Sequence, residues 1–259
     1  MITAFFVFVL GAVAGSFLSA LLHRMRFGGS VLRGRSRCVS CKLELSATDL
    51  VPIASYLWRR GKCRQCRAPI GWQYLGLEIG MGAVFLASLF AGCGTFQDIG
   101  VTGPCLLETG RLALFTIFLA GIFVYDARYG EIPDALSVTG TALALVINLI
   151  RAPGSLVWLV LAAAVGSGFF LMQHVLGRGK WIGTGDIVLG AMLGMMVGWP
   201  GIVMALFFAY LLGLAVVSYL LITRRKKLGD SIPLGPFLTA GALIVLLTNA
   251  GSLLVGLYG

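Results

Sequence analysis

The chain has 259 residues, of which 58% are hydrophobic and 12% are charged, and its formal net charge at pH 7 is +10. Its mean hydropathy is +0.95, which excludes an ordinary soluble domain, because such domains carry about 25% charged residues. The composition therefore predicts a polytopic membrane protein.

Apolar runs that could cross a bilayer, for which about 20 residues are needed, occur at eight places along the chain. They lie at 3–22, 75–93, 109–125, 135–150, 155–176, 187–198, 201–222 and 237–257, and the fourth and sixth are short. The predicted fold is an all-α polytopic membrane protein with about eight transmembrane helices and a small cytoplasmic zinc-binding loop domain. The expected divisions are a first helix at 1–22, a basic loop at 23–74 and a seven-helix membrane domain at 75–259.

Lys and Arg residues are unevenly shared between the two faces of the membrane. Eleven lie between His23 and Tyr74, and others follow the third, fifth and seventh spans, whereas Arg111 and Arg151 are the two on the opposite face. Since basic loops remain on the cytoplasmic side, the sequence predicts that both termini face outward. This topology, together with anionic inner-leaflet lipid, explains the positive charge, so the bilayer is an expected partner and nucleic acid is not.

Four of the six cysteines form two CxxC pairs in the basic loop, Cys38 with Cys41 and Cys63 with Cys66, with 21 residues between the pairs. Paired CxxC turns at about this spacing can present four thiolates tetrahedrally to zinc. Four protein ligands leave no position for water, so the metal would be structural. Flanking cations are expected to lower the thiol pKa values. Two disulfides or four idle thiols are the alternatives, and a reducing cytoplasm argues against the disulfides.

Cys93 and Cys105 flank the first outward loop. They could form a disulfide in an oxidising compartment. They could equally be two unpaired apolar cysteines, and the sequence does not decide between these readings.

Two aspartates border apolar runs about sixty residues apart. Asp126 follows the third run, and Asp186 closes the tetrapeptide that begins at Gly183. An Asp at the centre of a membrane helix raises the free energy of membrane insertion by roughly 3 kcal/mol. Two such residues in one chain therefore indicate a catalytic role. Two carboxylates that share a proton are the working groups of an aspartic protease.

The local sequence also predicts where each aspartate sits on its helix. Pro133 cannot continue a helix, so a turn is expected before it and Asp126 should be the last residue of its span. Asp186 should lie where a helix begins, and Gly190 and Gly194 after it have the spacing of a close helix contact. The alternatives are an ordinary helix cap at Asp186 and a solvated loop after Asp126. The location of both acids on one membrane face favours a shared site.

The combination resembles the bacterial type IV prepilin peptidases, which are membrane aspartic proteases of the GxGD type. The resemblance covers nearly the whole chain, including the double CxxC loop. The matching segments are Gly15-Ser16-Phe17-Leu18, Asp49-Leu50-Val51-Pro52, Ser55-Tyr56, Arg67-Ala68-Pro69-Ile70, Glu78, Asp126 with Ile132-Pro133-Asp134, Gly183-Thr184-Gly185-Asp186 and Ile232-Pro233-Leu234-Gly235-Pro236-Phe237. The chain departs from the family at Ser19, where Asn is usual, and at Val188, where Lys is usual.

The resemblance implies that Asp126 and Asp186 are catalytic, with Gly183, Gly185, Pro133 and Asp134 as supporting residues of the two motifs. It implies cleavage of type IV prepilins and type II secretion pseudopilins at the cytoplasmic side of a bacterial inner membrane. It also implies N-methylation of the new amino terminus with S-adenosylmethionine. The sequence has no recognisable cofactor loop, so the residues that would bind the methyl donor remain unknown.

Two other classes of membrane protein have related features. Intramembrane proteases of the presenilin kind pair Tyr-Asp with Gly-x-Gly-Asp, and Tyr125 fits, but they lack the zinc loop and close with a Pro-Ala-Leu motif that is missing here. A non-proteolytic transporter or pilus-assembly protein could also use intramembrane carboxylates. A transporter is expected to show an internal repeat, and the two halves of this chain show none.

Overall fold

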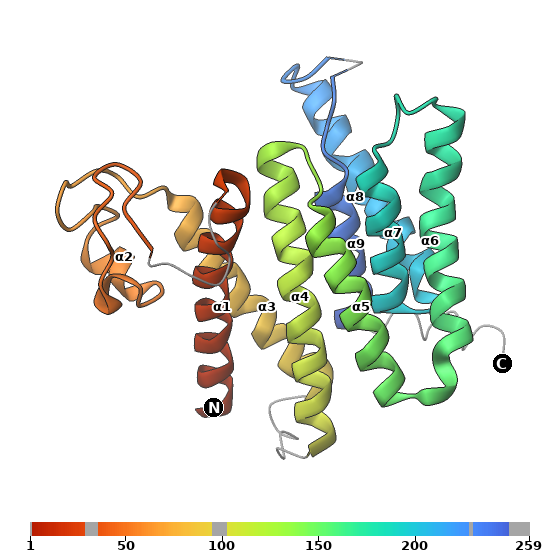
Figure 1. Cartoon of the computed structure of the whole chain (residues 1–259), viewed down its shortest axis with the longest axis horizontal. Coiled ribbons are helices and arrows are strands. Elements are labelled where there is room, and N and C mark those ends of the chain that lie inside the picture. Colours follow the sequence, from red (N-terminus) through yellow and green to blue (C-terminus); the bar gives the residue numbers. More distant parts are fainter. Residues whose placement is uncertain (1, 29–35, 95–102, 228–229, 249–259) are drawn as a thin grey trace. The chain divides into compact units, whose positions relative to one another are not determined.

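The computed structural model describes residues 2–28, 36–94, 103–227 and 230–248, and most of them are helical (Figure 1). The α-helices are α1 (Ile2–Phe27), α2 (Ala54–Trp58), α3 (Trp72–Cys93), α4 (Gly103–Tyr129), α5 (Asp134–Arg151), α6 (Leu156–Leu176), α7 (Thr184–Val197), α8 (Gly201–Ile222) and α9 (Gly235–Thr248). Two 3-10 turns, η1 (Ala47–Asp49) and η2 (Pro153–Ser155), complete the described elements. The all-α prediction is confirmed.

Six of the described helices are long and apolar enough to cross a membrane, namely α1, α3, α4, α5, α6 with its preceding turn η2, and α8. The other two predicted spans correspond to the shorter helices α7 and α9, each of 14 described residues. The end of the eighth predicted span, 249–257, lies outside the described residues. The structure therefore confirms a polytopic membrane protein, and within the described residues α7 and α9 are shorter than the other six.

The chain forms two compact units, residues 1–113 and 114–259. In the first unit, α1 packs along α3 (Figure 1). Small residues allow the two backbones to approach closely: a Cβ at Gly15 would lie 2.7 Å from the Leu77 carbonyl oxygen, and one at Gly11 would lie 2.5 Å from that of Met81. Close backbone approach at glycine is how apolar helices gain van der Waals contact in lipid.

In the second unit, α7 is the central helix and contacts α5, α6, α8 and α9. After its first turn it is apolar all round, as expected for a helix surrounded by others, and Leu189, Met192 and Leu193 are at most 1% exposed. A Cβ at Gly190 would lie 2.6 Å from the Gly166 carbonyl oxygen of α6, and Gly194 is equally tight against Ala162. The predicted close contact at Gly190 and Gly194 is confirmed, and its partner is α6.

The prediction that Asp126 ends its helix is wrong. The helix α4 continues to Tyr129, and Gly130 then takes a φ of 66°, with its N–H donating to the Asp126 carbonyl at 2.8 Å. Glycine ends helices in this left-handed conformation because it has no Cβ to clash. The turn expected before Pro133 is present, but it begins one helical turn later, so Asp126 projects from the last turn of α4.

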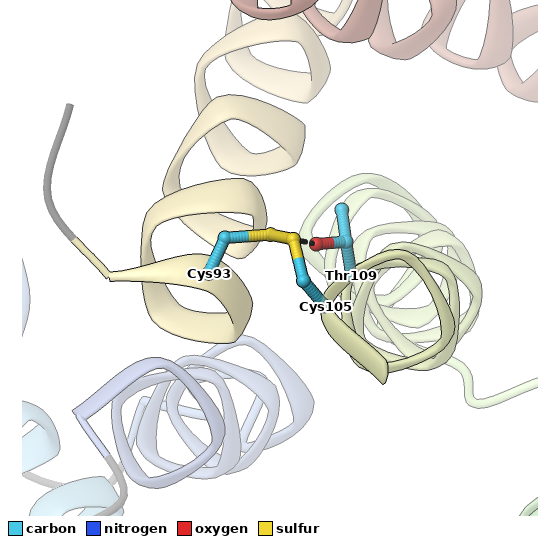
Figure 2. The surroundings of a disulfide bond; sticks show 3 residues. All are labelled: Cys93, Cys105 and Thr109. Atoms are coloured by element: carbon cyan, nitrogen blue, oxygen red, sulfur yellow. Dashed lines mark hydrogen bonds between the residues drawn. A yellow bond between two sulfur atoms is a disulfide. The ribbon is translucent and has the colours of Figure 1, made fainter. Parts of the chain in front are cut away.

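Cys93 and Cys105 form a disulfide between the last residue of α3 and the first turn of α4 (Figure 2). Their Cα atoms are 4.8 Å apart, and Thr109 lies 3.4 Å from the Cys93 sulfur through its hydroxyl oxygen. The structure thus decides between the two readings that the sequence left open.

Candidate active site and metal centre

The two CxxC pairs build two turns of matching geometry. In the first, the Cys38 N–H donates to the Leu43 carbonyl at 2.9 Å and the Lys42 N–H donates to the Cys38 carbonyl at 2.9 Å. In the second, Cys63 N–H donates to the Ala68 carbonyl at 2.9 Å, and Arg67 N–H to the Cys63 carbonyl at 3.1 Å.

The match extends to the backbone around each turn. Lys42 and Arg67, each directly after the second cysteine of its pair, have φ of 59° and 54°. The bridges that close the turns, Arg37 with Glu44 and Lys62 with Pro69, have the same spacing. The loop therefore contains two copies of one cysteine-presenting turn.

The two turns bring the four sulfurs together. The Sγ atoms of Cys38, Cys41, Cys63 and Cys66 all lie within 4.8 Å of one another, and those of Cys38 and Cys66 are 3.8 Å apart. Zinc–sulfur bonds of about 2.3 Å place the corners of a tetrahedron about 3.8 Å apart. The four thiols are free of disulfides, so the donor set and its spacing fit a structural zinc ion.

Two thiols of this cluster have pKa values shifted in opposite directions. A backbone hydrogen bond at Ala68 favours the Cys66 thiolate, but burial and hydrogen bonds with the other three cysteines outweigh it and raise the pKa of Cys66 to about 11. Hydrogen bonds to the backbone at Cys41 and Ser40 lower the pKa of the Cys38 thiol to about 6. A thiolate is the form that binds zinc. The sequence attributed low thiol pKa values to flanking cations, whereas the largest cause at Cys38 is the turn's own backbone.

A buried carboxylate attaches the cysteine loop to α3. Glu78 is 9% exposed, and its Oε2 accepts the N–H of Ile53 at 2.7 Å. Ile53 has a φ of 61°, which is a strained conformation for a β-branched residue. The contact therefore fixes a constrained turn of the loop against the N-terminal part of α3.

A second acidic residue braces the loop from within. Asp49 forms an ion pair with Arg59 at 2.5 Å and accepts hydrogen bonds from the Ser46 hydroxyl at 2.6 Å and its N–H at 3.0 Å. Burial opposes its charge, but the Ser46 hydrogen bonds and the Arg59 guanidinium outweigh burial and hold the pKa of Asp49 below its usual value. Both Asp49 and Glu78 belong to segments that carry the family resemblance, and the structure gives each a loop-stabilising contact.

Asp126 lies on the buried side of α4, with 4% of its surface exposed. Its Oδ2 accepts the backbone N–H of Gly235 at 2.8 Å. Gly235 is the first residue of α9 and is separated from Asp126 by 109 positions. The sequence placed Gly235 in a family motif but did not reveal this contact.

Asp186 is the third residue of α7 and is half-buried. Its Oδ2 accepts the N–H of Gly183, the residue that caps the helix, at 3.1 Å. Its charge also interacts with that of Asp126. The expected position at a helix start is confirmed, and Asp126 is one of the groups that contribute to the electrostatic environment of Asp186.

The two aspartate motifs contact each other through one residue of each, Ile132 and Gly185. Gly185 lies against Ile132, since a Cβ there would be 3.0 Å from the Ile132 Cβ. Pro133 caps α5, and its carbonyl accepts the N–H of Leu136 at 3.0 Å. Asp134 begins α5 and is exposed. Gly185 and Ile132 therefore connect the two motifs, and Pro133 begins the helix that follows the first, whereas Asp134 is exposed.

Comparison with known proteins gives two matches to family models. Residues 9–91 match the bacterial peptidase A24 N-terminal domain, and residues 113–218 match the type IV leader peptidase family. No solved structure matches the chain.

Several proteins named prepilin leader peptidase/N-methyltransferase are similar over most of the chain. The one from Burkholderia pseudomallei (strain 1026b) is 31% identical, over 93% of this chain and 84% of its own. That of Bacillus subtilis (strain 168) is 28% identical, over 93% of this chain and 92% of its own. That of Pseudomonas aeruginosa is 27% identical, over 92% and 88%.

Proposed function

The chain belongs to the type IV leader peptidase family, and from this premise we propose that it is a membrane aspartic endopeptidase that removes the leader of type IV prepilins and type II secretion pseudopilins. The activity and the prepilin substrates correspond to the names of its relatives. The observation that carries the proposal is that Gly185, beside Asp186 at the start of α7, lies against Ile132 of the turn that follows Asp126, so the two aspartate motifs meet within the second unit. One ionised and one protonated carboxylate form the pair that peptide hydrolysis by aspartic proteases needs.

In the proposed reaction, Asp186 takes a proton from a water molecule as the water oxygen bonds to the scissile carbonyl carbon. Asp126 donates its proton to the carbonyl oxygen. The tetrahedral intermediate then loses its C–N bond: the leaving amine takes the proton held by Asp186, and Asp126 recovers a proton from the intermediate. The assignment follows helix position, because Asp186 lies at a helix N-terminus, where negative charge is stabilised, and Asp126 lies at the opposite kind of end.

We further propose that the active site faces the cytoplasm. The helix α3 has the cysteine loop before its first residue and the disulfide at its last, Cys93. A spanning helix separates these two ends by the thickness of the bilayer. Free thiols suit the reducing cytoplasm and a disulfide suits the outer, oxidising side. This agrees with the orientation that the basic loops predict for a bacterial inner membrane protein.

Zinc is the metal that we propose for Cys38, Cys41, Cys63 and Cys66, in a structural role. Its four protein ligands would close the coordination shell, so hydrolysis would proceed at the aspartates alone. The family relatives are also N-methyltransferases by name, and S-adenosylmethionine would supply the methyl group to the new amino nitrogen. We assign no residue to the methyl donor.

We propose that the substrate's apolar helix enters from the lipid, because basic leaders gain no attraction from a basic cytoplasmic face. Glu131 and Asp134 are exposed beside the turn that follows Asp126. They are placed to meet the leader's cations locally. Charge reversal at Asp134 should then slow cleavage of basic leaders more than that of neutral ones.

The test is co-expression with a model prepilin, with leader removal measured by mass. We expect Asp126→Asn and Asp186→Asn to abolish cleavage, because each removes an ionisable partner but keeps the shape. Cys38→Ser should only weaken cleavage. Glu108→Gln, at the other end of α4, is the matched control and should cleave normally.

Cleavage that survives in either Asp variant would show that the pair is not the catalytic dyad. Loss of cleavage in the control as well would point to general damage of α4.

A further inference from the structure

The first turn of α9 directs one amide at Asp126. In that turn Pro236 has no N–H to donate, and the Phe237 and Leu238 N–H groups donate to the Leu234 carbonyl at 3.0 and 3.1 Å. The Gly235 N–H instead donates to Asp126 Oδ2 at 2.8 Å, and both residues are buried. The turn is itself braced, because the Thr239 hydroxyl, in a residue 2% exposed, donates to the Gly235 carbonyl at 2.8 Å.

The same contact leaves no room for a side chain. A Cβ on Gly235 would lie 2.6 Å from Asp126 Oδ2, 3.1 Å from its Cγ and 3.2 Å from its Cβ. Real Cβ atoms essentially never come closer than 3.0 Å to another heavy atom. Any residue other than glycine must therefore push the Asp126 carboxylate away from its present position. Glycine is needed here for space.

We propose that Gly235 is a positioning residue for the catalytic pair. Its amide fixes Oδ2 of Asp126, so that Oδ1 is the oxygen that faces the scissile carbonyl. The Gly183 amide holds Oδ2 of Asp186 in the corresponding way at 3.1 Å, so each carboxylate has one oxygen anchored by backbone and one for chemistry. The inference rests on the proposed protease function and adds to it the segment that begins α9.

Two variants of the purified full-length enzyme separate the steric effect from the hydrogen bond. Gly235→Ala keeps the N–H but adds the clashing Cβ. Incorporation of glycolic acid at position 235 replaces the N–H with an ester oxygen and adds no side chain. The matched control is Gly168→Ala on α6, where a Cβ would meet nothing within 4 Å.

The assay measures kcat and KM for a synthetic peptide with a basic leader and the apolar helix that follows it. We expect the ester variant to lose about tenfold to a hundredfold in kcat, because Asp126 becomes a charged carboxylate as it gives up its proton and the Gly235 amide then stabilises that charge. Gly235→Ala should lose at least about a hundredfold, as expected for a misplaced catalytic group. KM should stay within about threefold in both variants, because the substrate-binding surface is unchanged. Gly168→Ala should match the wild type.

Wild-type kcat in the ester variant, or a change confined to KM, would overturn the positioning role. Thermal unfolding shows whether Gly235→Ala still folds; if it does not, the ester variant decides, since it adds no side chain. Asp126→Asn is measured in parallel. Cleavage by Asp126→Asn would overturn the protease proposal itself. Loss of cleavage in Asp126→Asn together with normal cleavage by the ester variant would overturn the inference on Gly235 alone.

Discussion

The close contact of α6 with α7, which we call the α6–α7 seam, is formed by Gly190 and Gly194 against Gly166 and Ala162. It allows a quantitative prediction, because Asp186 lies on α7 one turn before Gly190. Gly190 lies against the α6 backbone, where an added Cβ would be 2.6 Å from the Gly166 carbonyl oxygen and 2.8 Å from its carbonyl carbon. Ordinary contact of a Cβ begins at 3.4 Å. Gly190→Ala must therefore widen the seam by about 0.8 Å, since a backbone atom cannot rotate away as a side chain can.

This widening should affect both stability and catalysis. Overpacking of a tight contact costs about 1–3 kcal/mol of folding free energy. A displacement of about 1 Å at a catalytic group lowers the rate by about a hundredfold, and Asp186 is only four residues from Gly190. We therefore expect Gly190→Ala to be folded but destabilised, with cleavage reduced by roughly tenfold to a hundredfold.

The assay is prepilin cleavage by the purified protein together with its thermal unfolding. Gly168→Ala is again the control, because it makes the same change on a face of α6 that meets nothing within 4 Å. Wild-type cleavage by Gly190→Ala would refute the argument that the α6–α7 seam sets the position of Asp186. Equal damage from both variants would show that any added methyl group perturbs the helices.

Three further predictions concern the first unit. The wild type should carry one zinc ion by elemental analysis and Cys38→Ser almost none, and a chelator should open the loop to proteolysis because metal binding supplies its folding free energy. Arg67→Val should weaken zinc binding by about tenfold or more, since a β-branched residue at a φ of 54° destabilises the folded turn by about 1–3 kcal/mol. Arg67→Gly should bind zinc as the wild type does. Equal zinc affinities of the Val and Gly variants would contradict the argument from backbone strain. Cys93→Ser should lower stability by at most about 3 kcal/mol, from a loop of 12 residues, and an unchanged melting temperature would show that the helices already hold these ends together.

Much of the architecture could be read from the sequence, because it depends on neighbouring residues. The length and hydropathy of each apolar run predict its helix. The two CxxC pairs predict the cysteine cluster, because each turn is built within about eight residues, from Arg37 to Glu44 in one copy. Asp186 lies at the helix start that the sequence predicts, because Gly183 before it caps α7.

Other features were decided only by tertiary contacts. The helix α4 passes the expected end at Asp126 because Gly130, and not Pro133, terminates it. The pairing of Cys93 with Cys105 depends on how the ends of α3 and α4 meet. The amide of Gly235 reaches Asp126 across 109 positions of the chain. Local patterns fix which helices form and which residues they carry, but a hydrogen bond between distant segments exists only once the helices pack, so the orientation of the catalytic carboxylate is a property of the assembled second unit.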